Sequence, residues 1–306
     1  MNKIIVITGP TATGKTDLSV KLCQDIGGEV ISADSVQIYK KLNIGSAKPS
    51  LDERQGIPHH LMDFLEPDEA FSVADYCTLA KKCADDILSR GKIPVIVGGT
   101  GLYISSLVDN ISFQESTKNE KIRNKLLCEL EELGKDGMHK RLSEIDPLAA
   151  SQIHPNNTKR VLRALEVFYT TGKTKSEQNA VSKLNKSPYE FILCALNVER
   201  ELLYERINKR VDIMINNGLI DEVKGLLDSG INPSCQSMQG IGYKEVVSYL
   251  NGKLNMDECI EKIKQGSRNY AKRQLTWFKR GDYKWFDALS PDLYDEFRAY
   301  IGEFGI

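Results

Sequence analysis

The segment GPTATGKT at residues 9–16 constrains the fold most strongly, because it directly follows the apolar run KIIVITG at residues 3–9. It fits G-x-x-x-x-G-K-[ST], a loop whose backbone N–H groups bind phosphate between a buried strand and a helix. In the segment TDLSVKLCQDI that follows, Leu18, Leu22 and Ile26 have the four-residue spacing of a helix. The sequence therefore predicts an α/β fold with a P-loop core.

The residue types in this loop suit the binding of a phosphate chain. Gly9 and Gly14 let the backbone close around an anion at the positive end of the following helix. Lys15 supplies a counter-charge, and Thr16 supplies a hydroxyl ligand for Mg²⁺. The residues expected to bind phosphate are Gly9, Pro10, Thr11, Ala12, Thr13, Gly14, Lys15 and Thr16.

Strand-like and helical segments alternate along the first third of the chain. Beyond the first strand, residues 28–35 and 92–101 are expected to be strands, with a loop at 43–60 and a helix around 72–90 between them. This alternation predicts a parallel sheet with helices on both faces. Two later strands are expected, at residues 191–198 and 283–287, and long helices lie between them.

The segment 116–189 is polar and helical in pattern and carries no strand signal. We therefore expect a catalytic core formed by residues 1–115 and 190–306, interrupted by a helical insertion at 116–189.

Composition limits the possible partners and compartment. The net charge is −1, so binding to nucleic acid would require a local basic patch. The seven cysteines are scattered, form no C-x-x-C and read as reduced thiols, and the four histidines lack metal-ligand spacing. The chain begins directly with a strand, which leaves no room for a signal peptide, and no apolar run could span a bilayer. These features predict a cytoplasmic protein without a membrane partner.

Two absences narrow the class of phosphate-binding protein. The expected third strand ends VIVGGTG, without the acidic residue that helps hold Mg²⁺ in motor ATPases. The N-K pairs of the sequence all lack the aspartate of the guanine-reading N-K-x-D. The pattern therefore favours a transferase that binds a diphosphate or a triphosphate.

Asp34 and Thr100 are expected at the carboxyl edge of the sheet, where parallel α/β proteins bind their ligands. Position alone leaves Asp34 as a general base, a residue near a metal, or a cap of its own turn. Thr100 could hydrogen-bond a substrate or simply end a turn.

Several segments together resemble one family. GPTATGKT, SADSVQIY, NIGSAKP, PHHLMD, VGGTGLYI, NNTKRVLRALEV, QGIGYKE and YAKRQLTWFKR occur in the order seen in tRNA dimethylallyltransferases, also called tRNA isopentenyltransferases. The resemblance covers nearly the whole chain. It implies transfer of a prenyl group from dimethylallyl diphosphate to the exocyclic amine of the adenosine 3′ of the anticodon. The chain ends at Ile306 without the zinc finger of many eukaryotic members, as bacterial members do.

The resemblance also assigns roles in catalysis. The P-loop would bind the diphosphate that leaves, with Mg²⁺, Lys15 and an arginine stabilising its charge. Arg206 and Arg210 match the arginine-bearing helix of the family. Arg206 is expected among the diphosphate-binding residues and Arg210 in the catalytic set, and the resemblance leaves open which of the two contacts the diphosphate. Asp34 matches the proposed general base and Thr100 the residue that orients the amine.

Three segments are expected to contact the tRNA anticodon loop, whose unpaired adenosine can be flipped into a site. One lies against the flipped base, one is in the helical insertion, and one is a basic helix with three cations at i, i+4 and i+8. Tyr270 and Trp277 lie near the opposite face of that helix and are expected in the core. The predicted contacts are Asp34, Ser35, Val36 and Gln37; Lys159, Arg160, Val161, Leu162 and Arg163; and Lys264, Arg268 and Lys272.

Other readings share parts of this pattern. A small-molecule or nucleotide kinase would share the P-loop but would not need the basic segment 264–281. An isopentenyltransferase for free adenine nucleotides would share the core but not the long insertion. A pure RNA-binding module would not need Lys15, Thr16 and Asp34. The expected partners are tRNA and dimethylallyl diphosphate, and the chain is expected to be a monomer.

Overall fold

The computed structural model describes residues 2–111, 119–182 and 186–306. It has two compact units, one formed by the chain up to Leu107 together with Pro188–Ile306, and one by Val108–Ser187. Of the predicted limits of the helical insertion, residue 116 lies outside the described residues, and residue 189 is the first residue of a strand.

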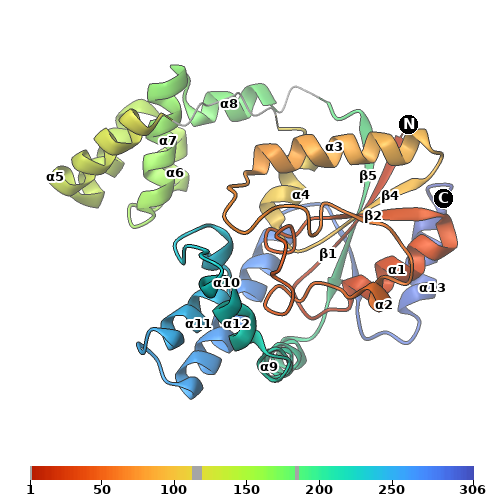
Figure 1. The fold of residues 1–306 in the computed structure, drawn as a ribbon. Helices are drawn as coiled ribbons and strands as arrows, with labels where there is room; N and C mark the ends of the chain where they lie inside the picture. Colours follow the sequence, from red (N-terminus) through yellow and green to blue (C-terminus); the bar gives the residue numbers. More distant parts are fainter. Residues whose placement is uncertain (1, 112–118, 183–185) are drawn as a thin grey trace. The chain divides into compact units, whose positions relative to one another are not determined.

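A six-stranded sheet forms the centre of the first unit (Figure 1). Its order is β3-β2-β4-β1-β5-β6, and every neighbouring pair is parallel, which confirms the predicted α/β class. Ile7 and Ser32 both pair with Val97, so β1, β2 and β4 end at one edge. The strands are β1 Asn2–Thr8, β2 Gly28–Ser32, β3 His59–His60, β4 Ile93–Val97, β5 Tyr189–Asn197 and β6 Lys284–Asp287.

Helices connect these strands and surround the sheet. The segment 43–60, expected to be a loop, contains the short helix α2 and the two-residue strand β3. A capping box between Ser50 and Glu53 begins α2, which is a local signal that the sequence does contain. The helices are α1 Lys15–Ile26, α2 Leu51–Arg54, α3 Val73–Ser89, α4 Gly101–Val108, α9 Arg200–Asn216, α10 Leu219–Asp228, α11 Tyr243–Leu250, α12 Met256–Phe278 and α13 Leu293–Gly302, with a 3₁₀ turn at Ser237–Gln239.

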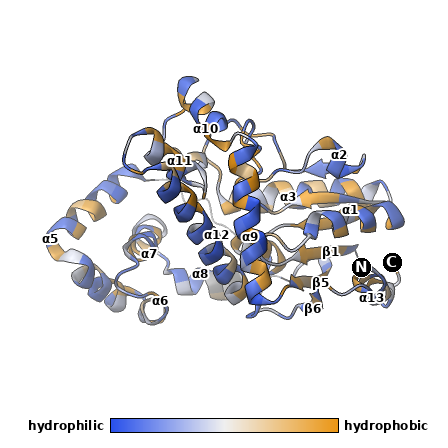
Figure 2. Ribbon diagram, turned by 90° about the horizontal axis from the view of Figure 1, so that it is seen from below, coloured by the Kyte–Doolittle hydropathy of each residue, from blue (hydrophilic) through white to orange (hydrophobic). Residues whose placement is uncertain are grey.

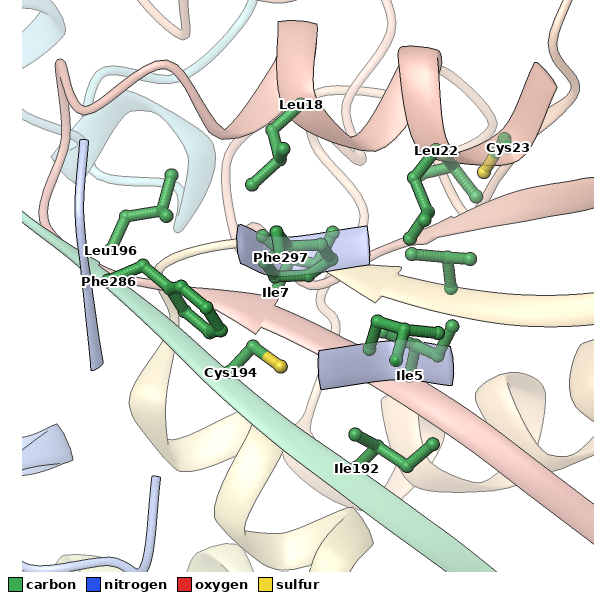
Figure 3. Packing of buried hydrophobic residues seen from close by; sticks show 13 residues of the cluster. Ile5, Ile7, Leu18, Leu22, Cys23, Ile192, Cys194, Leu196, Phe286 and Phe297 are labelled. Atoms are coloured by element: carbon green, nitrogen blue, oxygen red, sulfur yellow. The ribbon is translucent and has the colours of Figure 1, made fainter. Parts of the chain in front are cut away.

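Apolar side chains fill both faces of the sheet. Figure 3 shows Leu18 and Leu22 of α1 facing Ile5 and Ile7 of β1, in a cluster that includes Phe297 of α13. Because side chains alternate along a strand, the equally buried Ile4 and Val6 point to the other face. There α3 lies across the strands (Figure 1). The packed sheet fixes the edge from which the loop 9–14 and Asp34 project.

Helices α9 and α12 pack side by side next to the sheet (Figure 2). Their buried apolar contact includes Leu203 and Ile207 of α9 and Ala271 of α12, with Val198 before α9. The two helices are otherwise largely hydrophilic in Figure 2. Among the described residues, we find no helix that combines the length and apolar character needed to cross a membrane.

The second unit is helical, with α5 Glu120–Ile145, α6 Pro147–Gln152, α7 Thr158–Thr171 and α8 Lys175–Ser182. Gly134 has a φ of 66° and breaks the helical path of α5. Leu126 and Leu142 of α5 pack against Val161 and Leu165 of α7, which gives this unit a core of its own.

Candidate active site

The loop between β1 and α1 has a backbone shape that the sequence motif requires. Gly9 and Gly14 have φ angles of 137° and 79°, a region that favours glycine. A Cβ at Gly9 would lie 2.5 Å from the carbonyl oxygen of Leu196 in β5, so no side chain fits there. Ala12 also has a positive φ, 67°. The loop leads into the start of α1, whose first N–H groups lack carbonyl partners within the helix and favour an anion.

Lys15 turns back over this loop. Its ammonium donates to the carbonyl oxygens of Pro10 at 2.6 Å and Gly9 at 3.1 Å. Burial and the nearby guanidinium of Arg210 lower the pKa of Lys15 to about 7, while Asp34 acts in the opposite direction. Three charged groups predicted for the site, Lys15, Asp34 and Arg210, are thus close enough to influence one another.

Arg210 of α9 contacts the loop directly. Its Nη1 donates to the hydroxyl of Thr11 at 3.0 Å, and burial lowers its pKa. Arg206 lies one helical turn earlier and is half-buried, and its predicted contact with a diphosphate stays a prediction. The geometry therefore favours Arg210 as the arginine that acts beside the loop.

Asp34 follows β2 and folds onto its own turn. Its Oδ1 accepts the backbone N–H groups of Val36 at 2.8 Å and Gln37 at 3.2 Å. The capping role that position alone allowed is therefore present in the structure. Because both bonds end on Oδ1, the carboxylate can cap the turn and still offer Oδ2 to a ligand.

Thr100 is hydrogen-bonded to the turn that carries Asp34. Its hydroxyl oxygen accepts the backbone N–H of Ser35 at 3.0 Å, and its own N–H donates to the carbonyl oxygen of Ala33 at 3.1 Å. Thr100 thus joins the turn after β4 to the turn after β2, which carries Asp34.

A cavity of about 340 Å³ opens beside these residues within the first unit. Its lining combines charged and polar groups with aliphatic side chains of α9, α12 and the 239–241 segment. The lining includes Thr11, Asp34, Ser35, Val36, Gly45, Ser46, Ala47, Ile207, Arg210, Val211, Met214, Gln239, Gly240, Ile241, Lys244, Ile263, Ser267, Tyr270 and Arg273. A wall of this kind suits a ligand with both an anionic and an apolar part.

The residues present fit an Mg²⁺ ion that is coordinated mainly by substrate phosphate and water, with few protein groups. Within the described part of the chain, no group of three or more His, Cys, Asp or Glu could hold a metal. Thr16 and Ser32 line one small cavity of about 30 Å³, and the buried Ser32 hydroxyl has no hydrogen-bond partner among the described residues. Hydroxyl groups and water suit Mg²⁺, which usually keeps several waters and binds substrate phosphates.

Helix α12 ties the phosphate-binding loop to the turn after β4. Gln274, which is 5% exposed, accepts the N–H of Thr11 at 3.0 Å and donates to the carbonyl oxygen of Gly99 at 2.9 Å. Tyr270 donates to the same carbonyl oxygen at 3.3 Å and lines the cavity, where burial raises its pKa. Both Tyr270 and Trp277 were expected in the core, but both are only half-buried: Tyr270 borders the cavity, and Trp277 packs against Gly101.

The three predicted cations of α12 differ in their surroundings. Lys264 pairs with Asp212 of α9 at 2.6 Å. Arg268 donates to Asn208 of α9 and to Glu261, both at 2.7 Å. Lys272 is exposed. Two of the three therefore already join α12 to its surroundings, and contact of all three with tRNA stays a prediction.

The predicted segment of the second unit presents a basic surface of its own. Lys159, Arg160 and Arg163 are exposed on α7. Burial lowers the pKa of Lys175, and the positive charges of Arg160 and Arg163 lower it further. Arg163 also pairs with the buried Glu166 at 3.1 Å.

Two apolar residues of that segment, Val161 and Leu162, are 1% and 9% exposed and belong to the unit's core. Their side chains are therefore packed away from any RNA, unlike the exposed cations beside them.

Sequence reasoning missed several residues that shape the site, including Gln274, Tyr270, Glu222 and Tyr243. The last of these lies in QGIGYKE, a segment quoted for the resemblance but given no role. This short motif, far from the P-loop in the sequence, was the one indication that the segment helps to form the cavity wall.

The parallel sheet, the glycine-containing loop and the adjoining cavity define an α/β protein with a candidate anion site at the carboxyl edge of its sheet. A family model described as IPP transferase matches residues 37–281, and one described as Isopentenyl transferase matches residues 2–64. The chain belongs to the IPP transferase family, which confirms the resemblance seen in the sequence.

Curated relatives match along the whole chain. The tRNA dimethylallyltransferase of Caldanaerobacter subterraneus subsp. tengcongensis is 49% identical over 305 residues, covering 99% of this chain and 97% of the relative. That of Acetivibrio thermocellus is 46% identical over 311 residues, covering 100% and 99%. These similarities confirm the prediction of a prenyltransferase.

Two solved structures are similar to this chain in both sequence and fold. The full-length tRNA isopentenylpyrophosphate transferase of Bacillus halodurans is 44% identical with a TM-score of 0.75, covering 99% of this chain and 96% of that one. A eukaryotic dimethylallyltransferase acting on tRNA is 35% identical with a TM-score of 0.83, covering 99% of this chain and 80% of that one.

Proposed function

We propose that this protein transfers the dimethylallyl group of dimethylallyl diphosphate to the exocyclic amine of the adenosine 3′ of the anticodon in tRNA. The observation that carries the proposal is the cavity in which Asp34, Arg210 and Thr11 of the phosphate-binding loop lie together. It provides, in one space, an anion site, a carboxylate and an apolar wall.

The diphosphate is the leaving group. As the C–O bond breaks, the bonding electron pair stays with the diphosphate, whose charge grows. The N–H groups of the loop, Lys15 and Arg210 surround the place where this charge develops, which is where fixed donors and charges lower a barrier most. Thr16 would help to hold Mg²⁺, whose positive charge would offset part of the same negative charge.

Asp34 is the proton acceptor. The adenosine amine forms the new C–N bond and must lose one proton, since its lone pair is conjugated with the ring and the product is neutral. Because Oδ1 accepts two backbone N–H groups, Oδ2 is the oxygen that takes the proton. Thr100 holds the turn behind it through the N–H of Ser35.

An RNA substrate fits the positive groups near the cavity better than a free nucleotide does. Arg273 lines the cavity and lies 5.6 Å from the centre of the Tyr270 ring, and Lys272 beside it is exposed. On the second unit, Lys159, Arg160 and Arg163 form a separate exposed basic segment. Phosphate contacts of this kind position RNA, while the base enters the site.

The test is a competition between acceptors. The protein is given labelled dimethylallyl diphosphate and Mg²⁺ with unmodified tRNA, with AMP, or with both at equal concentration. We expect the label to enter tRNA in each mixture that contains it. Labelling of AMP alone would instead support the isopentenyltransferase for free nucleotides.

A further inference from the structure

We infer that Glu222 of α10 is a positioning residue for Asp34, acting through the loop formed by residues 43–47. This inference rests on the proposed function, because it concerns the group that takes the proton. Glu222 is distant from Asp34 in the chain, and its place in the reaction comes from a continuous set of hydrogen bonds.

The carboxylate of Glu222 is surrounded by four donors. Its Oε2 accepts the N–H groups of Asn43 at 2.9 Å and Ile44 at 2.8 Å. Its Oε1 accepts the N–H of Gly45 at 3.1 Å and the hydroxyl of Tyr243 at 2.8 Å. Three consecutive backbone N–H groups therefore converge on one side chain, which fixes the first half of the 43–47 loop.

The second half of the loop is joined to the turn that carries Asp34. The side-chain amide of Gln37 donates to the carbonyl oxygens of Ser46 and Ala47, each at 3.1 Å. The backbone N–H of the same Gln37 donates to Asp34 Oδ1 at 3.2 Å. A shift of the loop would thus pull on Gln37, and Gln37 is one of the two donors that orient the carboxylate.

The loop has a shape that it would not keep unaided. Ala47 has a φ of 47°, a strained conformation that a non-glycine residue keeps only where its surroundings impose it. Gly45 lies against Tyr243 so closely that a Cβ would come within 2.6 Å of the ring. Gly45, Ser46 and Ala47 also line the cavity, so the loop held by Glu222 is part of the site wall.

The chemistry of the contact requires a carboxylate. An ionised carboxylate only accepts hydrogen bonds and can serve four donors, whereas a glutamine offers one oxygen and directs an NH₂ group at the remaining donors. Glu222→Gln keeps the size of the side chain and should release part of the loop. Displacement of a reacting group by about 1 Å can cost up to 10²-fold in rate.

A double-mutant cycle distinguishes positioning from general damage. Single-turnover prenyl transfer is measured for the wild-type protein, Glu222→Gln, Asp34→Asn and the double variant, with saturating tRNA and donor. If Glu222 acts through Asp34, Glu222→Gln lowers the rate by about 10- to 100-fold in the wild-type background and leaves it nearly unchanged when Asp34 is already Asn. Equal losses in both backgrounds, or no loss in either, would overturn the inference.

Two further variants test the inference and control for general effects if Glu222→Gln is poorly folded. Tyr243→Phe removes one of the four donors, and we expect a few-fold loss of rate with the same dependence on Asp34; a loss that persists in Asp34→Asn would contradict us. Asp228→Asn on the same helix, an exposed position, should leave the rate unchanged. An inactive wild-type protein would remove the proposed function itself, which is a separate outcome from a cycle that fails to show coupling.

Discussion

Lys15 carries a charge that its surroundings disfavour, so we expect the affinity of the loop for an anion to depend on pH. Its pKa is lowered to about 7 by burial and by Arg210. Below that pH the ammonium is present, and above it the free protein increasingly loses the proton. A diphosphate favours the ammonium and should raise the pKa again, so binding above pH 7 should take up a proton.

We therefore predict that the affinity for inorganic diphosphate with Mg²⁺ falls as the pH rises through 7, with proton uptake. Calorimetry in buffers of different ionisation enthalpy measures that uptake. Lys15→Met is the control, since any uptake that remains belongs to the diphosphate. Equal uptake by both proteins would show that Lys15 stays protonated throughout.

Asp34→Asn separates the two roles that Asp34 combines. The asparagine keeps an oxygen for the N–H groups of Val36 and Gln37, but it does not accept a proton at neutral pH. We predict a fall of about 10²–10⁴ in the single-turnover rate, the usual contribution of a general base. Affinities for tRNA and donor should change far less. Recovery of the rate in excess Mg²⁺ would point to a role near the metal instead.

At the scale of residues, local motifs indicated candidate site residues only where these lie close together in the sequence. The residues predicted to bind phosphate are consecutive, and Asp34 follows a strand that the sequence pattern predicts. Gln274 meets Thr11 across 263 positions and Glu222 meets Ile44 across 178, and such contacts have no local signature. Tyr270 was misplaced for the same reason, because the periodicity of α12 does not show that part of its inner face borders a cavity.

At the scale of elements, α12 joins parts of the molecule that perform different tasks. One side of the helix carries cations, and the other carries Gln274, which holds both the phosphate-binding loop and the turn after β4. A Cβ at Gly99 would come within 2.0 Å of the Gln274 amide, so the two elements are in close contact.

Replacing Gln274 with Met should weaken both attachments without a large change in volume. The N–H of Thr11 would lose its partner, and the carbonyl oxygen of Gly99 would keep only the longer bond from Tyr270. An unpaired buried group costs about 1–3 kcal/mol. We predict a decrease of this size in the free energy of unfolding, measured with urea, and weaker binding of diphosphate. Thr276→Ala on the exposed side of α12 is the control. Unchanged diphosphate affinity would show that the loop does not depend on α12.

The basic side of α12 makes a separate prediction about RNA. Removing one cation that binds a phosphate should lower the slope of log affinity against log salt by about 0.7–0.9. We predict that the triple alanine variant of Lys264, Arg268 and Lys272 binds tRNA with a shallower slope and binds dimethylallyl diphosphate normally. Lys262→Ala, an exposed position on another side of the helix, should keep the wild-type slope. A triple variant with that same slope would show that these cations do not bind tRNA, and would leave Lys264 and Arg268 with only their contacts to α9.

Element prediction succeeded where the pattern extended over many residues. The helix expected around 72–90 is α3 at Val73–Ser89, and the strand expected at 191–198 is β5 at Tyr189–Asn197. It failed for α2 and β3, which have four and two residues. Elements this short depend on neighbouring contacts, here the pairing of β3 with β2, more than on their own sequence.

At the scale of the whole molecule, the order of the strands brings three separate turns to one edge. The turns after β1, β2 and β4 carry the phosphate-binding loop, Asp34 and Thr100, and these strands are neighbours in the sheet. The edge was predictable from the alternation of strands and helices. The wall that α9 to α12 add to it was not, because helical periodicity gives the buried face of a helix but not its partner.

We expect the loop at 9–16 to hold the diphosphate that leaves, with no nucleotide consumed in the reaction. The most direct measurement counts diphosphate released and prenyl groups gained by tRNA in the same samples, with Mg²⁺ and without any nucleoside triphosphate. We predict one diphosphate for each prenyl group, with the group on the adenosine 3′ of the anticodon. Product that forms only when ATP is added, together with release of ADP, would contradict it.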